Sequence, residues 1–503
     1  MFNKILIANR GEIAVRIARG CREMGISPVA VYSEADRASL HVRMADEAIC
    51  LGPAPSAESY LSIEKVIDAA KSVGAEAIHP GYGFLSENAD FAEAVEKSGL
   101  TLIGPPSAAM RLMGSKTSAR LIAQKANAPV VPGTTSALGS VEEAHRTASE
   151  IGYPIMLKAA SGGGGKGLRL IRSAAELPEA YGLARSEAES SFKDSSVYIE
   201  KYIERPRHIE IQLMGDCFGN LIYLGERECS LQRRHQKVIE EAPSPIMDPG
   251  LRQRMGEAAV SIAREAGYWN AGTIEFLVDR DKNFYFLEMN TRLQVEHSVT
   301  ELVIGRDLVH EQVRVASGAK LSLAQTDVSI RGHAVECRIY AEDPANNFLP
   351  SPGLITGLRV PAGPGIRNDS GIYDGWEVPV HYDSLLAKLI VWAEDRGAAL
   401  ARLARALDEY SIDGIHTSLG FFKEIVANRD FQAGNFDTGF IERFLSSSAH
   451  RPDPKRDAKT SGDVGLRDMA ALAAVLSSRS QAGSQAGAPC RESRSRWKWY
   501  PGS

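Results

Sequence analysis

Short apolar segments alternate with helical segments through the first hundred residues, and this alternation constrains the fold more than any other feature. Three segments have the length and apolar character of buried strands: Lys4–Ala8, Val29–Tyr32 and Ala77–His79. Three others have helical patterns: Ile13–Met24, Ile63–Ala70 and Phe91–Glu96. Strands that alternate with helices are typical of a parallel sheet covered on both faces, so we expect a doubly wound α/β domain at the N-terminus.

The turn after the first of these strands argues against a dinucleotide cofactor. It reads Asn-Arg-Gly-Glu-Ile-Ala over residues 9–14 and lacks the G-x-G-x-x-G spacing of dinucleotide-binding turns. A nicotinamide- or flavin-binding domain is the obvious alternative for a doubly wound sheet, and this turn does not favour it.

The pattern of segments changes twice more along the 503 residues, a length that exceeds what one core supports. From about Gly114, glycine and charge increase, and five segments read as strands: Val197–Ile203, His208–Met214, Leu221–Gly225, Gly272–Val278 and Phe284–Met289. From about Ile330 to Val391, short strands alternate with Gly/Pro turns, and two helices follow, Gly397–Tyr410 and Ser418–Ala427. We expect domains at 1–113, 114–330 and 331–446.

Residues 447–503 are rich in Ser, Arg, Ala and Gly and contain few large apolar side chains. Such a segment cannot bury enough surface to offset its ordering entropy, so we expect a mostly disordered tail. Within it, Leu466–Leu476 has the composition of a short helix, which either packs on the body of the protein or docks a partner.

Net charge and cysteine content exclude several classes of protein. The formal net charge of -5 gives no reason to expect nucleic acid or an anionic membrane as a partner. The 6 cysteines are scattered without a C-x-x-C pair, which suits reduced thiols better than a disulfide framework. No stretch approaches the roughly 20 apolar residues that span a bilayer, and the first apolar run is too short for a signal peptide. We therefore expect a cytoplasmic protein.

A glycine run between two predicted strands is the first chemical signal. Strand Ile155–Lys158 ends in a lysine, Ser-Gly-Gly-Gly-Gly-Lys-Gly follows at 161–167, and strand Leu168–Ile171 comes next. Without side chains, successive backbone N–H groups can close around phosphate oxygens while a lysine neutralises charge. The spacing is not that of a P-loop. A flexible linker is the alternative, but the flanking strands favour a β-hairpin lid.

Two glutamates lie on a second predicted hairpin. Glu275 is on strand Thr273–Val278 and Glu288 is on strand Phe284–Glu288, with a turn at 279–283. Cross-strand neighbours lie about 5 Å apart. The two carboxylates could therefore bridge one or two Mg²⁺ ions, which are usually held by carboxylates together with phosphate oxygens. A solvated hairpin face is the alternative.

Polar residues occupy every even position from 288 to 296, in the order Glu288, Asn290, Arg292, Gln294 and Glu296. Most of the odd positions between them are apolar. Alternate residues share a face in an extended chain, so we expect one strand to present two acids, two amides and an arginine together. An exposed edge strand would show similar alternation, but rarely this mixture of functional groups.

Cations are dense in the segment Glu226–Lys237, which reads Glu-Arg-Glu-Cys-Ser-Leu-Gln-Arg-Arg-His-Gln-Lys. A basic segment is usually a solvated surface. This one follows a predicted strand and lies between the two candidate site elements, so anion binding is the functional interpretation.

Taken together, these motifs resemble biotin carboxylase, a member of the ATP-grasp superfamily, over residues 1 to 446. The shared segments are 7–14 (Ile-Ala-Asn-Arg-Gly-Glu-Ile-Ala), 79–88 (His-Pro-Gly-Tyr-Gly-Phe-Leu-Ser-Glu-Asn), the glycine loop after Lys158, 232–237 (Gln-Arg-Arg-His-Gln-Lys), 288–297 (Glu-Met-Asn-Thr-Arg-Leu-Gln-Val-Glu-His) and Ala334–Ile339. The resemblance implies an N-terminal domain with a parallel sheet, an ATP-grasp domain with a mobile lid, and a C-terminal mixed β/α domain.

The resemblance also implies a role for each matching position. The ATP phosphates are assigned to Lys116 and Lys158, and the lid to Gly163, Gly164, Gly165, Lys166, Gly167 and Leu168. The rest of the nucleotide pocket is assigned to Glu200, Lys201, Ile203, His208, Gln232 and His235. The magnesium (or manganese) ligands are assigned to Glu275, Glu288 and Asn290. The bicarbonate site is assigned to Lys237, Arg292, Gln294, Val295 and Glu296, with Glu296 as the base, and Arg338 is assigned to the biotin enolate.

This family uses ATP and bicarbonate to carboxylate biotin through carboxyphosphate. The chain contains no Met-Lys dipeptide, the type of turn to which biotin is attached, so we expect the biotin carboxyl carrier protein and the carboxyltransferase to be other chains. The resemblance further implies a homodimer and, by default, an acetyl-CoA carboxylase in fatty acid synthesis, with propionyl-CoA, another acyl-CoA or pyruvate as alternative acceptors. One departure is Ser298, where the family usually has proline; we expect it to loosen the loop beside Glu296.

Two other functions compete with this one. A different ATP-grasp carboxylate–amine ligase would not need the bicarbonate residues. A catalytically inactive nucleotide-binding scaffold would be expected to have lost Glu296, Arg292 or Arg338, and all three are present.

Overall fold

The computed structural model describes residues 1–134, 137–159, 168–192 and 195–447. Its N-terminal sheet has five strands in the order β3-β2-β1-β4-β5, and every neighbouring pair is parallel. The strands are β1 (Lys4–Ile7), β2 (Ser27–Ser33), β3 (Glu47–Gly52), β4 (Ala77–His79) and β5 (Thr101–Leu102). The expected parallel sheet is confirmed, and β3 and β5 are additions at its edges.

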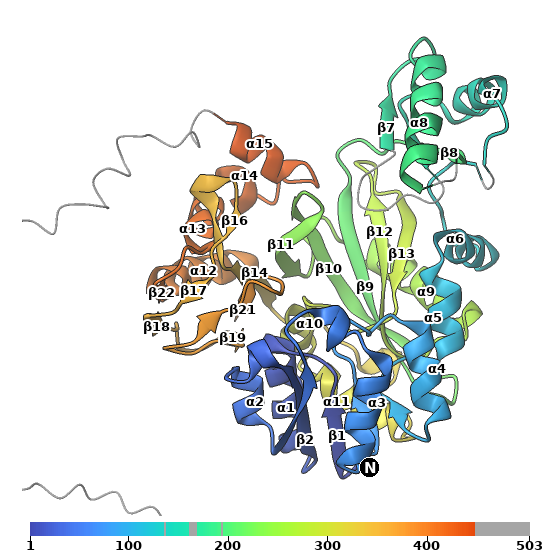
Figure 1. Ribbon diagram of the computed structural model, residues 1–503. Coiled ribbons are helices and arrows are strands. Elements are labelled where there is room, and N and C mark those ends of the chain that lie inside the picture. The colour runs from blue at the N-terminus through green and yellow to red at the C-terminus, as the bar shows by residue number, and fades with distance from the viewer. Residues whose placement is uncertain (135–136, 160–167, 193–194, 448–503) are drawn as a thin grey trace, which may run out of the picture. The chain divides into compact units, whose positions relative to one another are not determined.

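Helices cover both faces of this sheet (Figure 1). Ile5 and Ile7 of β1 pack in one core cluster with α1 (Gly11–Glu23), while Leu6 packs in another with α3 (Ile63–Ser72) and α4 (Ala89–Lys97). This division follows from the alternation of side chains along a strand. Two shorter helices complete the region, α2 (Leu40–Met44) and α5 (Ser107–Gly114).

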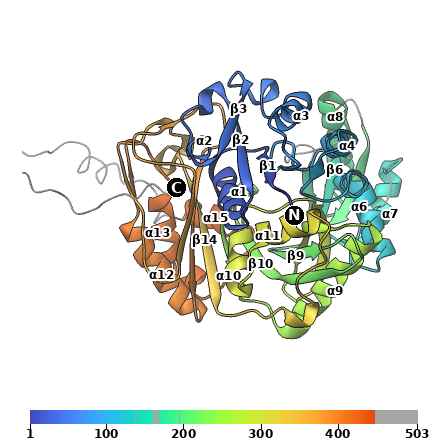
Figure 2. The ribbon, with the colours of Figure 1, turned by 90° about the horizontal axis from the view of Figure 1, so that it is seen from below.

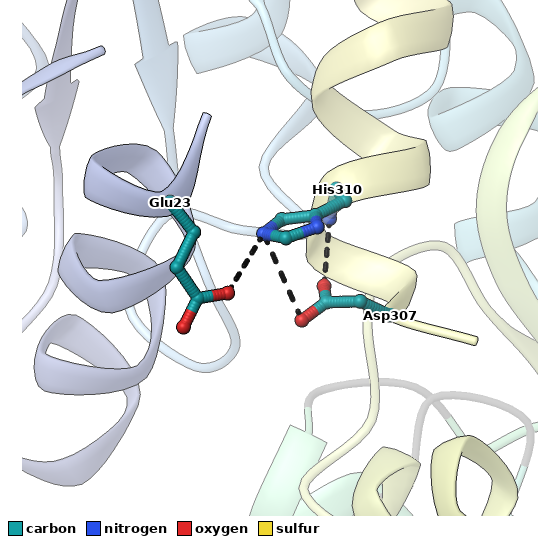
Figure 3. A group of neighbouring side chains, drawn as sticks. All are labelled: Glu23, Asp307 and His310. Carbon is teal, nitrogen blue, oxygen red and sulfur yellow. Dashed lines mark hydrogen bonds and ion pairs between the residues drawn. The ribbon is translucent and has the colours of Figure 1, made fainter. Parts of the chain in front are cut away.

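Helix α1 also packs against α11 (Leu308–Ala316), which lies beside it in Figure 2. At one end of this contact, His310 Nε2 lies 3.4 Å from Glu23 Oε2 and 3.9 Å from Asp307 Oδ2 (Figure 3). Arg16 of α1 reaches the same Asp307 carboxylate at 2.6 Å. Polar contacts therefore fix the N-terminal sheet to the segment that follows the predicted bicarbonate residues.

The second sheet has eight antiparallel strands in the order β13-β12-β9-β10-β11-β14-β21-β19. Their bounds are β9 (Arg207–Gly215), β10 (Leu221–Arg233), β11 (Gln236–Ala242), β12 (Asn270–Val278), β13 (Phe284–Asn290), β14 (His333–Tyr340), β19 (Ile366–Ser370) and β21 (Leu385–Ala393). Because β11 pairs with β14, the sheet runs without a break across the expected domain limit at 330.

Helices pack on both faces of the large sheet as well. On one face, α6 (Lys116–Lys125) and α9 (Pro249–Glu265) share a core with apolar residues of β9 and β12, such as Ile211 and Phe276. On the other, α10 (His297–Ile304) contacts β10, β11, β14 and β21. Val299 of α10 packs on Ala334 of β14, so the even-numbered side chains of β14 face α10.

The described part of the chain ends in a helical region with short strands. Its helices are α12 (Arg396–Glu409), α13 (Leu419–Ala427), α14 (Arg429–Gln432) and α15 (Phe440–Ser446). Its short strands are β15 (Glu342–Asp343), β16 (Leu349–Pro350), β17 (Gly353–Leu354), β18 (Gly357–Arg359), β20 (Glu377–Val378) and β22 (Ser411–Asp413). The two helices predicted from the sequence are thereby confirmed as α12 and α13.

A third sheet, β7-β6-β8, flanks the glycine run. It consists of β6 (Ile155–Ala159), β7 (Leu168–Ile171) and β8 (Val197–Lys201), and it packs against α7 (Val141–Ile151) and α8 (Leu177–Phe192). The hairpin β6–β7 confirms the two strands predicted around the glycines. Residues 160–167 and the predicted tail at 447–503, apart from its first residue, lie outside the described residues.

The described part of the chain contains neither a disulfide nor a helix that could span a membrane. Its five cysteines, Cys21, Cys50, Cys217, Cys229 and Cys337, are all free. Within that part, no helix is both long enough and apolar enough to cross a bilayer.

Candidate active site

Glu296 lies immediately before α10 and is fully buried. Its Oε1 accepts a hydrogen bond from Lys237 Nζ at 3.0 Å, and its Oε2 accepts one from Arg338 Nη2 at 2.8 Å. Burial and the nearby Glu210 carboxylate act to raise the pKa of Glu296, but the charges of Lys237 and Arg338 outweigh them and lower it. Glu296 is therefore an ionised carboxylate held between two cations.

Arg338 is placed in the site by the alternation of β14, because it shares the face of Ala334 that packs on α10. Its Nε donates to Glu240 Oε1 of the neighbouring strand β11 at 2.7 Å. Glu240 and Glu296 thus bracket one buried guanidinium, whose planar fork presents several N–H donors at once.

A β-bulge in β11 aims Lys237 at the same site. Leu231 pairs with Ile239 but Gln232 pairs with Lys237, so Val238 is an extra residue on the bulged strand. Lys237 therefore faces the side that carries Glu240. Its Nζ donates to Glu210, to Glu275 Oε1 at 2.8 Å and to Glu296.

The segment predicted to be either a solvated basic surface or an anion site turns out to be mostly interior. Arg227 is fully buried and donates to Glu210 Oε2 at 2.9 Å and to Gln212 Oε1 at 2.6 Å. The solvated interpretation is wrong for this arginine. It holds for Arg234 and His235, which are exposed in the turn between β10 and β11 with φ of 50° and 67°.

The two predicted metal acids are direct partners across the hairpin β12–β13. Glu275 pairs with Glu288, as expected, and a bulge at Leu287 follows because Phe276 pairs with Phe286. Burial and the Glu275 charge raise the pKa of Glu288, and the opposing charges of Lys116, His208 and Lys237 do not offset them. Asn290 Nδ2 donates to Glu275 Oε1 at 2.7 Å. Two opposed carboxylates and a neighbouring amide are a donor set that fits Mg²⁺.

The extended strand predicted to reach Glu296 is wrong beyond Asn290, where β13 ends. Past that point the chain contacts Glu87 of the N-terminal region, which accepts from Thr291 N at 3.1 Å and from Arg292 Nε at 3.0 Å. Leu293 is buried in the core shared with α1.

The polar side chains of that segment nevertheless converge. Arg292 Nη1 donates to Gln294 Oε1 at 2.8 Å, and its Nη2 donates to Asn290 Oδ1 at 3.1 Å. Gln294 Nε2 lies 3.4 Å from Glu275 Oε1. The residue set predicted from the alternation is therefore brought together by a loop rather than by one strand face.

Four of the predicted nucleotide residues form two contacting pairs. His208 Nε2 lies 2.8 Å from Glu275 Oε2, and His208 Nδ1 lies 3.1 Å from Gln232 Nε2, so these two adjoin the metal acids. Two others lie in the third sheet, where Lys158 bonds Glu200, and Arg120 Nη1 lies 3.3 Å from the second oxygen of Glu200.

Other described residues that were predicted to bind the nucleotide lie on or next to β8, α6 and β7. Lys201 donates through Nζ to the carbonyls of Gly152 and Tyr153, at 2.9 and 3.1 Å, and Ile203 follows β8. Lys116 is exposed at the start of α6, and its charge acts on Glu288. Leu168 begins β7, whereas Gly163, Gly164, Gly165, Lys166 and Gly167 lie outside the described residues.

A cavity of about 560 Å³ opens beside Arg338, Arg292 and Val295. Most of its other lining residues were not singled out from the sequence: Arg10, Glu12, Tyr82, Phe84, His381 and Tyr382. Tyr82 and Phe84 belong to the 79–88 motif, so the family resemblance could have indicated that they lie at the site. His381 and Tyr382 come from the C-terminal region and carried none.

Comparison with known proteins shows the family of the chain. Models of the biotin carboxylase N-terminal domain and of the biotin carboxylase C-terminal domain match residues 1–110 and 336–443. A model of the carbamoyl-phosphate synthase L chain ATP-binding domain matches residues 115–324. A biotin carboxylase from Nostoc sp. is 54% identical over 441 residues, covering 88% of this chain and 99% of that protein. The chain belongs to the biotin carboxylase family.

Two further relatives bear on what this biotin carboxylase does. A pyruvate carboxylase subunit from Methanothermobacter thermautotrophicus is 55% identical over 88% of this chain and 90% of its own length. The biotin carboxylase domain dimer of Hydrogenobacter thermophilus 2-oxoglutarate carboxylase, solved with MgADP, ADP and bicarbonate, is 48% identical with a TM-score of 0.81, covering 88% of this chain and 98% of that one.

The chain is thus a biotin carboxylase, an ATP-dependent carboxylase of the ATP-grasp ligase family. The expectations of family, fold and enzyme class are confirmed. The family assignment argues against the two competing hypotheses, a different ligase and an inactive scaffold. Neither would need both Glu296 and Arg338, and these two side chains are present and form a buried ion pair.

Proposed function

We propose that Glu296 is the base that deprotonates bicarbonate as it attacks the γ-phosphorus of ATP. The observation that carries this role is its ionised, fully buried carboxylate, held between Lys237 and Arg338. Bicarbonate is a poor nucleophile, so a positioned base must take its proton while the new P–O bond forms and the bond from the γ-phosphorus to ADP breaks. Lys237, Arg292, Gln294 and the Val295 backbone form the surrounding anion site.

Glu275, Glu288 and Asn290 would hold the metal. Bound there, Mg²⁺ would neutralise charge on the phosphate oxygens. The chain's own residues do the rest: Lys237 and His208 keep Glu275 ionised, and Glu288 supplies the second carboxylate across the hairpin.

Lys116, Lys158 and the lid residues 163–168 would bind the ATP phosphates, and Glu200, Lys201, Ile203, Gln232 and His235 would complete the nucleotide pocket. In the structure, Lys158 is paired with Glu200. Phosphate oxygens must draw the ammonium away, and Arg120 remains beside Glu200 to balance the carboxylate left behind.

Carboxyphosphate then breaks down to CO₂ and phosphate beside biotin; the released phosphate takes the ureido N–H proton, and the nitrogen bonds to the carbon of CO₂. The ureido nitrogen becomes nucleophilic only when its oxygen carries enolate charge, and Arg338 is the cation at the edge of the 560 Å³ cavity that can meet it. Because Arg338 contacts Glu296, the sites for the two half-steps are adjacent.

We propose that a biotin carboxyl carrier protein and carboxyltransferase subunits complete the enzyme in the cytoplasm, that the chain forms a homodimer, and that acetyl-CoA is the final acceptor in fatty acid synthesis. We further propose domain limits of 1–113, 114–330 and 331–446. Analytical ultracentrifugation tests the dimer. Reconstitution with each candidate acyl-CoA or with pyruvate tests the acceptor.

Transfer of oxygen from bicarbonate to phosphate tests the chemistry. Attack by a bicarbonate oxygen on phosphorus, followed by cleavage of the C–O bond, leaves that oxygen on the released phosphate. With ¹⁸O-labelled bicarbonate and Mg-ATP, we expect one ¹⁸O in the phosphate, read by mass spectrometry. Unlabelled phosphate from a bicarbonate-dependent turnover would rule out the carboxyphosphate route.

A further inference from the structure

Lys388 of β21 is a buried ammonium next to the active site that the mechanism above does not use. Its side chain has no exposed surface. Its Nζ donates to the carbonyl oxygen of Val295 at 2.6 Å and to Ser298 Oγ at 3.0 Å. A buried charge without water must find its partners in the protein, so these two hydrogen bonds satisfy a strong requirement.

The charge of Lys388 is balanced by acids from two other parts of the chain. Glu12 Oε1 of α1 lies 3.7 Å from its Nζ, and Asp369 Oδ2 of β19 lies 3.8 Å away. Ser298 Oγ donates to the same Asp369 oxygen at 3.1 Å. Burial acts to lower the pKa of Lys388, but nearby acids, Glu12 and Asp369 among them, outweigh it, so the amine stays protonated.

Asp369 is itself held in place by an ion pair with Arg367. Arg367 Nη2 donates to Asp369 Oδ2 at 2.7 Å, and Arg367 Nη1 donates to Glu301 Oε2 of α10 at 2.7 Å. Lys388 is therefore held by α1, α10 and β19 at once, and it has little freedom to leave the Val295 carbonyl.

Ser298 differs from expectation in a way that points to its role. The family resemblance implies proline at this position, and we expected serine to loosen the loop. Instead it is fully buried in the first turn of α10, and its hydroxyl links Lys388 to Asp369. Proline would supply no hydroxyl, so this contact belongs to the serine of this chain.

We propose that Lys388 and Ser298 are positioning residues that fix the Val295–Glu296 turn, and with it the distance between the base and bicarbonate. Both act through the backbone, since Lys388 contacts Val295 O one residue before Glu296, and Ser298 lies two residues after it. A displacement of about 1 Å in a reacting group costs about 100-fold in rate, so a loop that carries a base needs such anchors. This inference rests on the proposed role of Glu296.

The test compares Ser298→Ala and Lys388→Met with wild type in full-length protein. Steady-state ADP release gives KM for bicarbonate and for ATP separately, and calorimetry gives the nucleotide Kd. We expect Ser298→Ala to raise KM for bicarbonate or lower bicarbonate-dependent kcat by about 3- to 10-fold, and Lys388→Met to lower that kcat by about 100-fold. The KM for ATP and the nucleotide Kd should stay within about twofold, because neither residue contacts the nucleotide residues described above.

Ser39→Ala is the matched control. Ser39 is also buried, and its Oγ donates to a buried aspartate, Asp36, at 2.9 Å, but it lies outside the Glu296 cluster. Wild-type bicarbonate kinetics in Ser298→Ala, or an equal loss in Ser39→Ala, would overturn the proposal. If Lys388→Met does not fold, Ser298→Ala decides alone. A wild-type enzyme whose ADP release ignores bicarbonate would instead contradict the role of Glu296.

Discussion

Glu296 and Arg338 are joined by a hydrogen bond of 2.8 Å between Oε2 and Nη2, and both side chains are almost entirely shielded from solvent. The group assigned to deprotonate bicarbonate therefore forms an ion pair with the group assigned to stabilise the biotin enolate. In the structure this pair is present without either substrate. When Glu296 takes up a proton, it loses that charge, and the guanidinium becomes a stronger partner for a developing anion. This coupling gives a physical order to the two half-steps.

Glu296→Gln keeps the size of the side chain and removes the base. We expect bicarbonate-dependent ADP release to fall by about 10²- to 10⁴-fold, the range for loss of a general base. Nucleotide binding, measured by calorimetry, should persist because Glu296 is not among the nucleotide residues. Glu342→Gln is the control, since Glu342 is a buried glutamate paired with Arg233 at 2.6 Å outside this cluster. Near-normal turnover in Glu296→Gln would place the base elsewhere.

Arg338→Met leaves Glu296 and Glu240 as buried carboxylates with one partner fewer. Breaking a buried ion pair in this way typically costs about 3–5 kcal/mol, so urea denaturation should show a loss of that order. The double variant Arg338→Met, Glu240→Gln should recover part of the loss, because one of the unpaired charges is gone. Equal stability of the single and double variants would show that Glu240 does not balance Arg338.

Glu288→Gln removes the carboxylate whose pKa is raised by burial and by the Glu275 charge. We expect the Mg²⁺ concentration for half-maximal activity to rise by roughly 10- to 100-fold or more, since losing even a supporting contact of a metal ligand costs that much. Glu257→Gln, on the exposed side of α9, should leave the Mg²⁺ titration unchanged. An unchanged titration in Glu288→Gln would remove this residue from the metal site.

Glu336 of β14 is fully buried, and neither of its carboxylate oxygens has a hydrogen-bond partner. Burial raises the pKa of Glu336 well above 4.5, although Lys388 opposes the shift. The folded protein thus keeps a proton that the unfolded chain releases as pH rises above about 4.5, and its stability falls by up to about 1.4 kcal/mol per pH unit from this group.

Glu336→Gln should remove that contribution. Unfolding free energies measured at several pH values between 5 and 8 should show the variant gaining on wild type as pH rises. A constant difference across this range would mean that Glu336 is ionised in the folded protein.

The fold was largely predictable because its signals are local. The continuous apolar runs of β1, β2 and β4 follow from burial on both faces of the sheet. Together with the helical periodicity of α1, α3 and α4, they indicated the parallel sheet. Strand β3 escaped because it is an edge strand whose side chains are mostly half-buried or exposed. Strand β10 was predicted to end at Gly225 but runs to Arg233, because buried partners such as Glu210 stabilise Arg227 in the interior.

The site was predictable as a set of residues but not as a geometry. Glu275 and Glu288 were expected to oppose each other, and hairpin pairing delivers that. The bulge at Val238 that turns Lys237 toward Glu296 has no residue signature. After β13 ends at Asn290, the chain contacts Glu87, some 200 residues away in sequence, and local pattern gives no sign of that contact. Lys388 was not singled out because a lone lysine in an apolar strand gives no hint of its partners.

The most direct test of the central claim is ADP release by the purified chain with Mg-ATP, measured with and without bicarbonate and free biotin. The account predicts little release without bicarbonate, release when bicarbonate is added, and a further rise with biotin, because Glu296 and Arg338 serve consecutive steps. Release that is indifferent to both, or ATP binding without any release, would contradict it.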